Sequence, residues 1–230
     1  MTKLFKIFLI IYITGGFLSS QNIYANHPLS NAEEETPIKK VLIFGDSMTG
    51  WLGERLNAYG QKDGFQVATV VWDGSTIKKW GSTSKLSAII KEQNPDAVLI
   101  CLGLNELFSP NPQAQLGNYL HNILTAVGDR ECLWIGPPSW PGKKGGEAIN
   151  NWLESKLGSH RFYNSSSLKL ARQSKTNPHP TKAAAAQWMD EIISWIPHHS
   201  DLNFKSLESP GPNVMSRGKI FIYKRMREHL

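Results

Sequence analysis

Short apolar runs alternate with longer amphipathic stretches from Lys40 onward. In the amphipathic stretches, Leu116, Leu120 and Ile123 show the three-and-four spacing of one buried helix face. Strands that alternate with helices predict parallel strands joined by right-handed crossovers. We therefore expect an α/β fold, a three-layer α/β/α sandwich around a five-stranded parallel sheet. The five predicted strands are residues 41–44, 65–71, 97–102, 132–135 and a weaker run at 161–163.

The pattern changes after the last predicted helix. We expect this helix to run from about Pro180 to Trp195 and to be ended by Ile196-Pro197. We assign residues 40–197 to one domain and residues 198–230 to a basic C-terminal extension of unknown role. Two interpretations of the extension stay open. It is an edge strand or loosely attached tail, or it is a basic apolar anchor on an anionic surface.

The N-terminus reads as a secretory signal peptide over residues 1–25, with Lys3 and Lys6 ahead of an apolar stretch. An uncleaved membrane anchor is the alternative, but the stretch is short and interrupted by Gly15-Gly16. Residues 26–39 form a polar leader. These features predict export to the periplasm or the extracellular space.

The chain carries a formal net charge of +6, and removal of residues 1–25 would leave +4. The basic residues form no stripe interleaved with aromatic residues, so we expect no nucleic-acid partner. A mildly basic exported protein is better suited to peripheral contact with an anionic envelope surface or polymer.

Two cysteines, Cys101 and Cys132, fall inside two predicted strands. An exported protein can form disulfides, but neighbouring parallel strands seldom offer the required geometry. Two buried thiols are the favoured interpretation, and a disulfide is the alternative. Two cysteines are too few for a cysteine metal cluster, and we predict neither a metal nor a cofactor.

The candidate chemistry begins at Gly45-Asp46-Ser47, directly behind the apolar run at 41–44. This places a serine on a tight turn at the carboxyl end of a strand, where α/β folds carry reactive groups. A serine needs a base and oxyanion donors to act as a nucleophile. Suitable residues follow in the order Gly74, Asn105 and His179, each in its own short motif.

These four blocks resemble those of the SGNH, or GDSL-type, hydrolases, and the resemblance covers residues 40–196. It implies a flavodoxin-like strand order, 2-1-3-4-5, which places Ser47, Gly74 and Asn105 along one rim of the sheet. It also implies that Ser47 is the nucleophile and His179 the general base. The oxyanion donors would be the backbone N–H groups of Ser47 and Gly74 and the side-chain amide of Asn105.

His179 is followed by Pro180, which suits the first turn of a helix. We therefore expect His179 at or just before the N-terminus of the last helix, where the helix dipole disfavours a charged imidazole. Members of the family usually carry an aspartate three residues before this histidine, and here that residue is Thr176. Three explanations stay open: the Thr176 hydroxyl or a backbone carbonyl holds the ring, a carboxylate from elsewhere does, or the enzyme is weakened or inactive.

Other residues near the four blocks have less certain roles. Asp46 is expected to pin its turn through backbone hydrogen bonds, and Glu106 belongs to the Asn105 block without an assigned role. Tryptophans in the rim loops suit sugar rings, and we predict Trp72 and Trp140 as substrate contacts. Trp51 and Trp80 lie in the same set of loops.

The sequence thus predicts an exported serine esterase that removes a short acyl group, such as acetyl, from a carbohydrate or cell-envelope polymer. One alternative is an acyltransferase in envelope polysaccharide modification. A second is a binding or assembly protein on a degenerate hydrolase scaffold, for which the departure at Thr176 is the argument.

Overall fold

The computed structural model describes residues 37–139, 146–177, 179–204 and 207–223. The chain divides into two compact units, Met1–Glu35 and Thr36–Leu230, and the fold below is that of the second unit. The predicted signal peptide and Trp140 lie outside the described residues. In the described part of the chain, no helix has the length and apolar character needed to cross a membrane.

A single parallel sheet of six strands forms the centre of this unit, in the order β5-β4-β3-β1-β2-β6. Its first five strands follow the predicted order. The predicted count of five is wrong, because the sheet gains a sixth strand at its β2 edge. The strands are β1 (Lys40–Gly45), β2 (Gln66–Trp72), β3 (Ala97–Cys101), β4 (Glu131–Ile135), β5 (Phe162–Tyr163) and β6 (Lys219–Tyr223).

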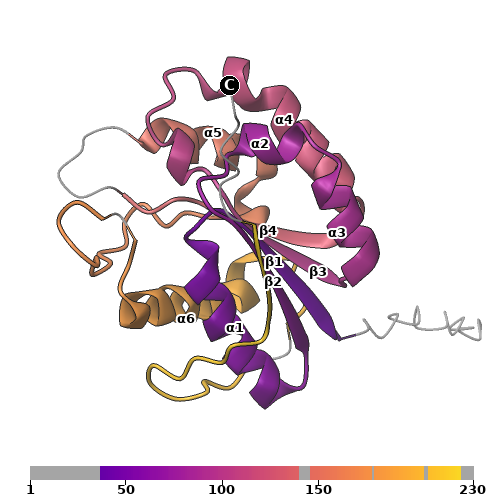
Figure 1. Ribbon diagram of the computed structural model, residues 1–230, viewed down its shortest axis with the longest axis vertical. Coiled ribbons are helices and arrows are strands. Elements are labelled where there is room, and N and C mark those ends of the chain that lie inside the picture. The colour runs from indigo at the N-terminus through magenta and orange to yellow at the C-terminus, as the bar shows by residue number, and fades with distance from the viewer. Residues whose placement is uncertain (1–36, 140–145, 178, 205–206, 224–230) are drawn as a thin grey trace, which may run out of the picture. The chain divides into compact units, whose positions relative to one another are not determined.

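Helices cover both faces of the sheet, which confirms the three-layer prediction (Figure 1). One layer holds α1 (Thr49–Asp63) and α6 (Lys182–His199), which pack against each other. The opposite layer holds α2 (Ile77–Gly81), α3 (Lys85–Gln93), α4 (Pro112–Val127) and α5 (Glu147–Leu157). Two short 3-10 helices, η1 (Leu104–Glu106) and η2 (Ser159–Arg161), follow β3 and precede β5.

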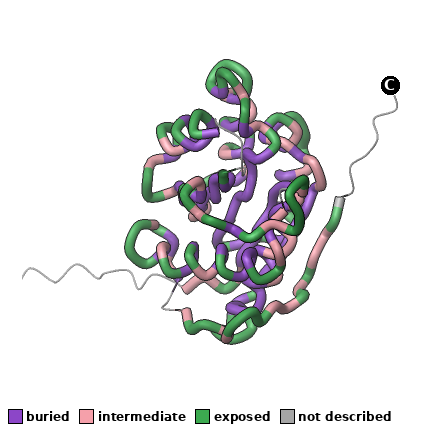
Figure 2. Tube along the Cα trace, turned by 90° about the vertical axis from the view of Figure 1, so that its left-hand side faces the viewer, coloured by how far each residue is buried: buried purple, intermediate pink, exposed green. Residues whose placement is uncertain are grey.

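The core lies on both faces of the sheet, and Figure 2 shows the exposed positions on the surrounding helices and loops. β1 and β3 are buried along almost their whole length because helices cover both faces. Three fully buried tryptophans each satisfy their indole N–H, as buried tryptophans require. Trp80 donates to Ser75 Oγ at 2.9 Å, Trp134 to Leu102 O at 3.0 Å and Trp188 to Ser165 Oγ at 2.9 Å.

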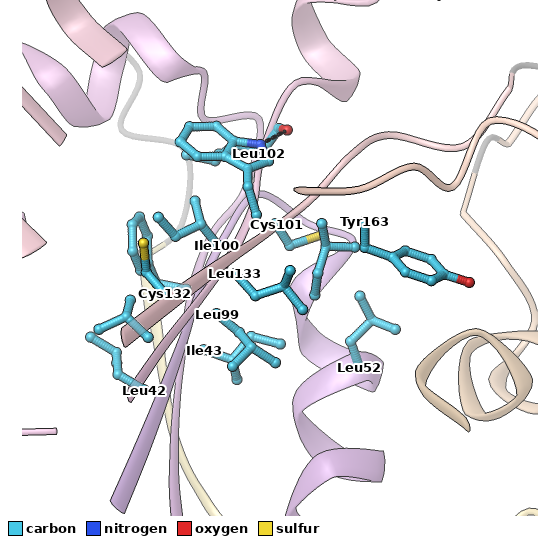
Figure 3. Close-up of a cluster of buried hydrophobic side chains, with 14 of the residues drawn as sticks. Leu42, Ile43, Leu52, Leu99, Ile100, Cys101, Leu102, Cys132, Leu133 and Tyr163 are labelled. Atoms are coloured by element: carbon cyan, nitrogen blue, oxygen red, sulfur yellow. Dashed lines mark hydrogen bonds between the residues drawn. The ribbon is translucent and has the colours of Figure 1, made fainter. Parts of the chain in front are cut away.

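Cys101 and Cys132 are both buried free thiols. The register pairs Cys132 with Val98 and Cys101 with Ile135, so the two cysteines are three positions apart along neighbouring strands. Because side chains alternate between faces, an odd offset puts the thiols on opposite sides of the sheet (Figure 3). This register explains why the strands do not carry a disulfide.

The last helix differs from its prediction at both ends. It begins at Lys182, where the N-cap residue Thr181 accepts a hydrogen bond from Ala184 N, and Pro180 lies outside it. It also continues through Pro197 to His199. Proline is tolerated there because only the last turn is affected, and Ser200 N still caps the helix through Ile196 O.

The buried side chain of Arg55 on α1 binds both α6 and the segment that follows it. Its guanidinium donates to both carboxylate oxygens of Asp190, at 2.7 and 2.9 Å, and to the carbonyl oxygens of Gly211 and Val214 at 2.8 and 2.7 Å. The segment bound by Arg55 continues into β6, which pairs with β2 over five residues. The segment that we set apart as an extension therefore completes the sheet.

Candidate active site

Ser47 lies on the turn that joins β1 to α1, and the backbone on this turn approaches β3 closely. A Cβ atom on Gly45 would lie 1.9 Å from Cys101 O, so only glycine fits there. The backbone N–H of Asp46 donates to the same carbonyl at 3.2 Å. The turn is thus fixed to the centre of the sheet, and Ser47 is half-buried at its tip.

Asp46 serves the turn as predicted from the sequence. Its Oδ1 accepts a hydrogen bond from Met48 N at 2.9 Å, while the side chain is only 1% exposed. Burial raises the pKa of Asp46 to about 7, and the nearby charge of Asp73 adds to the rise. The hydrogen bond from Met48 opposes this shift without cancelling it.

His179 reaches Ser47 from the loop that precedes α6. Its Nε2 lies 2.8 Å from Ser47 Oγ, which is hydrogen-bond distance for a base and its nucleophile. The pKa of His179 is lowered, mainly by burial, while Asp73 raises it and Arg172 lowers it further. The expected cause was the dipole of the last helix. However, α6 begins at Lys182, three residues later, so desolvation keeps the ring neutral.

The group that meets the other side of the imidazole is Asn177, which sequence analysis missed. Its Oδ1 lies 2.5 Å from His179 Nδ1 and also accepts the backbone N–H of His179 at 3.0 Å. Thr176 was the candidate for this contact, but its side chain is exposed and its hydroxyl lies 3.4 Å from Ser174 Oγ. A usable signal was present, because an asparagine two residues before a backbone N–H commonly forms an Asx-turn.

The other two blocks lie beside the nucleophile turn. Ser75, next to Gly74, donates its hydroxyl to Gly45 O at 3.3 Å. Gly74 has a φ of 63°, a left-handed conformation that favours glycine. Asn105 donates through Nδ2 to Ser75 O at 2.7 Å, which leaves its second amide hydrogen for another acceptor. The predicted oxyanion donors are thus held in one connected set of loops.

Glu106 holds the Asn105 block against the start of α2. Its Oε1 accepts a hydrogen bond from Ile77 N at 2.6 Å. Burial raises the pKa of Glu106 to about 7, and the charge of Asp46 contributes to the rise. Glu106 is therefore a structural acceptor that joins two of the candidate oxyanion loops, a role the sequence left open.

A pocket of about 140 Å³ adjoins the serine and histidine, with Trp51, Gln173 and Pro180 in its wall. Of the predicted tryptophan contacts, Trp72 is only 7% exposed and packs edge-on against Trp80 with ring centroids 5.3 Å apart. This packing gives Trp72 a place in the core instead of at the pocket. Three larger hollows, of about 320, 390 and 400 Å³, lie elsewhere and have no histidine in their walls.

The loop that carries His179 is closed by backbone hydrogen bonds between its two arms. Gln173 N donates to His179 O at 3.0 Å, and Thr181 N donates to Ala171 O at 2.8 Å. Arg172 pairs with Pro180 as an isolated antiparallel bridge and donates to Ser139 O at 2.9 Å. Within the described residues, no group of three histidine, cysteine, aspartate or glutamate side chains is arranged to hold a metal ion.

Comparison with known proteins finds similar folds among solved structures but no match to a family model or a curated sequence. A G-D-S-L family protein from Desulfitobacterium hafniense DCB-2 superposes with a TM-score of 0.53 at 16% identity, over 69% of this chain and 99% of that one.

Two other solved structures carry esterase names. The family 3 carbohydrate esterase of Clostridium thermocellum gives a TM-score of 0.51 at 18% identity, over 70% of this chain and 98% of its own. The psychrotrophic esterase EstA from Pseudoalteromonas sp. gives 0.53 at 19% identity, over 69% of this chain and 97% of its own. The predicted fold resemblance is therefore confirmed: the chain has the three-layer fold of the SGNH, or GDSL-type, hydrolases.

Proposed function

We propose that this protein is a serine esterase in which Ser47 is the nucleophile and His179 the general base. The observation that carries the proposal is the 2.8 Å contact between His179 Nε2 and Ser47 Oγ, at the rim where four chemically suited blocks meet. A loop histidine and a turn serine 132 residues apart have no structural need to meet in this way. The contact also argues against a degenerate scaffold with a dismantled site.

The chemistry follows from the atoms present. Ser47 Oγ attacks the ester carbonyl while His179 Nε2 accepts its proton, and the alcohol leaves with that proton. The carbonyl oxygen becomes an oxyanion that the N–H groups of Ser47 and Gly74 and the amide of Asn105 would stabilise. Water then attacks the acyl-enzyme by the same route and releases the acid. The lowered pKa of His179 keeps the base neutral near neutral pH.

A short acyl group on a carbohydrate or envelope polymer is the proposed substrate. A pocket of about 140 Å³ is small beside the roughly 300–1,000 Å³ of drug-sized ligand sites, which favours acetyl over a long acyl chain. One of the fold neighbours is named as a carbohydrate esterase. The predicted signal peptide and the basic net charge support an exported enzyme that acts on an anionic polymer.

The test combines a fluorophosphonate probe with turnover of a small acetyl ester, using purified protein. We expect the probe to label wild type at Ser47 and not to label Ser47→Ala, with hydrolysis lost in parallel. Absence of labelling and of turnover in folded wild-type protein would reject the proposal. A sugar acceptor added to the assay distinguishes transfer, because an acylated sugar in place of free acetate would indicate an acyltransferase.

A further inference from the structure

The imidazole of His179 is held by a side-chain amide, and an amide offers both an acceptor and a donor. If the oxygen of Asn177 faces Nδ1, that nitrogen must carry the proton and Nε2 is free to accept one. If the NH₂ group faced Nδ1, the proton would sit on Nε2 and the ring could not act as a base toward Ser47. The orientation of one amide therefore decides whether the site can work.

Backbone groups fix that orientation. Asn177 Oδ1 lies 3.0 Å from the backbone N–H of His179, which can only donate, so the oxygen must be on this side. The same oxygen lies 2.5 Å from His179 Nδ1. The amide nitrogen of Asn177 points the other way and lies 3.1 Å from Gln173 Oε1.

The orientation of Gln173 is fixed in turn. Its Nε2 lies 3.3 Å from the carbonyl oxygen of Pro180, which can only accept, so Oε1 is the atom left to face Asn177. Each of the two amides thus has one end set by a backbone group of the histidine loop. A reversed arrangement would bring donor against donor at His179 and acceptor against acceptor at Pro180.

We propose that Gln173 and Asn177 form an amide relay that holds His179 in the tautomer with its proton on Nδ1 and its lone pair on Nε2. The proposal rests on the proposed function, because the tautomer matters for catalysis only if Ser47 is the nucleophile. Both residues are positioning residues: they act on the reaction through His179. Asn177 makes the direct contact and dominates, while Gln173 is exposed and supports it.

The amide relay also affects the pKa of His179. A carboxylate at Nδ1 would favour the imidazolium, whereas the neutral amide orients the ring without adding charge. The charged groups that act on His179 are Asp73, which raises its pKa, and Arg172, which lowers it, and burial is the largest influence. Replacing the amide by a carboxylate should therefore raise the pKa of His179 and move the acid limb of activity to higher pH.

The direct test is nitrogen NMR of protein with ¹⁵N-labelled histidine, because ring shifts report the tautomer without any substrate. The chain has seven histidines, and the spectrum of His179→Ala assigns the signals of His179. We expect the Nδ1–H tautomer in wild type. Asn177→Leu, which keeps the size of the side chain but removes the amide, should shift the ring toward Nε2–H.

Four variants separate the contributions of Asn177 and Gln173. Asn177→Leu should lower kcat/KM by about 10²- to 10⁴-fold, mainly through kcat, as a wrong tautomer does in a serine triad. Asn177→Asp should keep the Nδ1–H tautomer and raise the pKa of His179 by about one unit or more. Gln173→Leu should cost less than about tenfold, since water can reach Asn177, and Gln173→Glu, which keeps the acceptor, should retain the wild-type tautomer.

The outcomes separate this proposal from the esterase proposal. If Asn177→Leu leaves the tautomer of His179 unchanged in folded protein, the relay is overturned even if the enzyme hydrolyses esters. If wild type shows the Nδ1–H tautomer and Asn177→Leu loses it while no ester is turned over, the relay stands and the esterase assignment fails. Thermal unfolding of each variant shows that the loop substitutions leave the fold intact.

Discussion

The two halves of the candidate site are built in different ways. Ser47 follows a buried strand, and its turn is fixed by Gly45 and Asp46, whose backbones pack against Cys101 O at the centre of the sheet. His179 comes from a long surface loop, and its ring is oriented by the half-buried Asn177 and the exposed Gln173. The nucleophile is placed by the sheet, and the base is placed by local turns of the chain.

The two halves should differ in how well they tolerate substitution. A side chain cannot be added at Gly45 without displacing backbone, because the approach to Cys101 O leaves no space. In the histidine loop, by contrast, residues 173–176 are exposed and their substitution should leave the fold intact. Variation in the loop can therefore alter the chemistry of the base while the nucleophile stays fixed.

The largest expected effect comes from removing either half of the pair. Ser47→Ala should lower kcat by about 10⁴-fold or more, and His179→Ala should be nearly as severe, because the two residues act as one unit. Partial recovery of His179→Ala above about pH 9 would fit a missing base. Steady-state hydrolysis of an acetyl ester measures both variants. Retained turnover in Ser47→Ala would end the serine mechanism.

The next effect tests whether the sheet also places the oxyanion donors. Asn105→Ala should reduce kcat by about 10²- to 10³-fold, the usual cost of one lost oxyanion donor. Its Nδ2 also donates to Ser75 O, so the loss could come from a displaced loop. Thermal unfolding of Asn105→Ala serves as the control, because a displaced loop would lower stability whereas the loss of an oxyanion donor alone would not. An unchanged kcat in Asn105→Ala would remove Asn105 from the oxyanion site.

The strand-borne half of the site was predictable from the sequence because its signals are periodic. Apolar runs predicted the first five strands, and the resemblance to the SGNH hydrolases implied their order. The ends of the first three strands then predicted the positions of Ser47, Gly74 and Asn105. The sequence left an edge strand as one of the open interpretations of the C-terminal extension. It did not predict the pairing of β6 with β2, because the segment before β6 is positioned by contacts far apart in the sequence, from Arg55 to Gly211 O and Val214 O. No local pattern near residues 219–223 carries that information.

For the histidine half, the sequence predicted that His179 takes part but not which group holds its ring. Comparison with the family pattern directed attention to Thr176, three residues before the histidine, whereas the ring is met by Asn177. The start of α6 at Lys182, and not at Pro180, changed the cause of the lowered pKa of His179 from a helix dipole to burial. Loop geometry depends on specific side-chain hydrogen bonds, which residue spacing does not encode.

The buried nucleophile turn should make stability depend on pH. Burial raises the pKa of Asp46 from 3.8 to about 7, so between these values the folded protein keeps a proton that the unfolded chain has released. Stability should therefore fall as pH rises from about 4 to 7, by at most about 1.4 kcal/mol per pH unit. Glu106, with its pKa also raised to about 7, acts in the same direction.

Asp46→Asn isolates this contribution, because asparagine has the shape of the protonated acid and does not ionise. The variant should gain on wild type as pH rises from 5 to 7, with a difference of at most about 3 kcal/mol. Urea unfolding at both pH values measures it. A pH dependence identical in the two proteins would mean that Asp46 ionises in the fold as it does in the unfolded chain.

The smallest expected effect is at Thr176, where family pattern and structure differ. If a hydroxyl at this position held the ring, Thr176→Asp would strengthen the base and shift its pH profile. In the structure His179 Nδ1 already contacts Asn177 Oδ1, and Thr176 is exposed beside Ser174.

A new carboxylate at residue 176 should therefore lie in solvent and change kcat/KM by less than about twofold, within the range of an exposed charge. The matched comparison is Asn177→Asp, which puts the same group one residue later and in contact with the ring. A pH–rate profile of both variants beside wild type decides between the two positions. A shift in Thr176→Asp equal to that in Asn177→Asp would mean that the loop rearranges to bring residue 176 to the ring, and that local turns do not fix the base as tightly as the sheet fixes the serine.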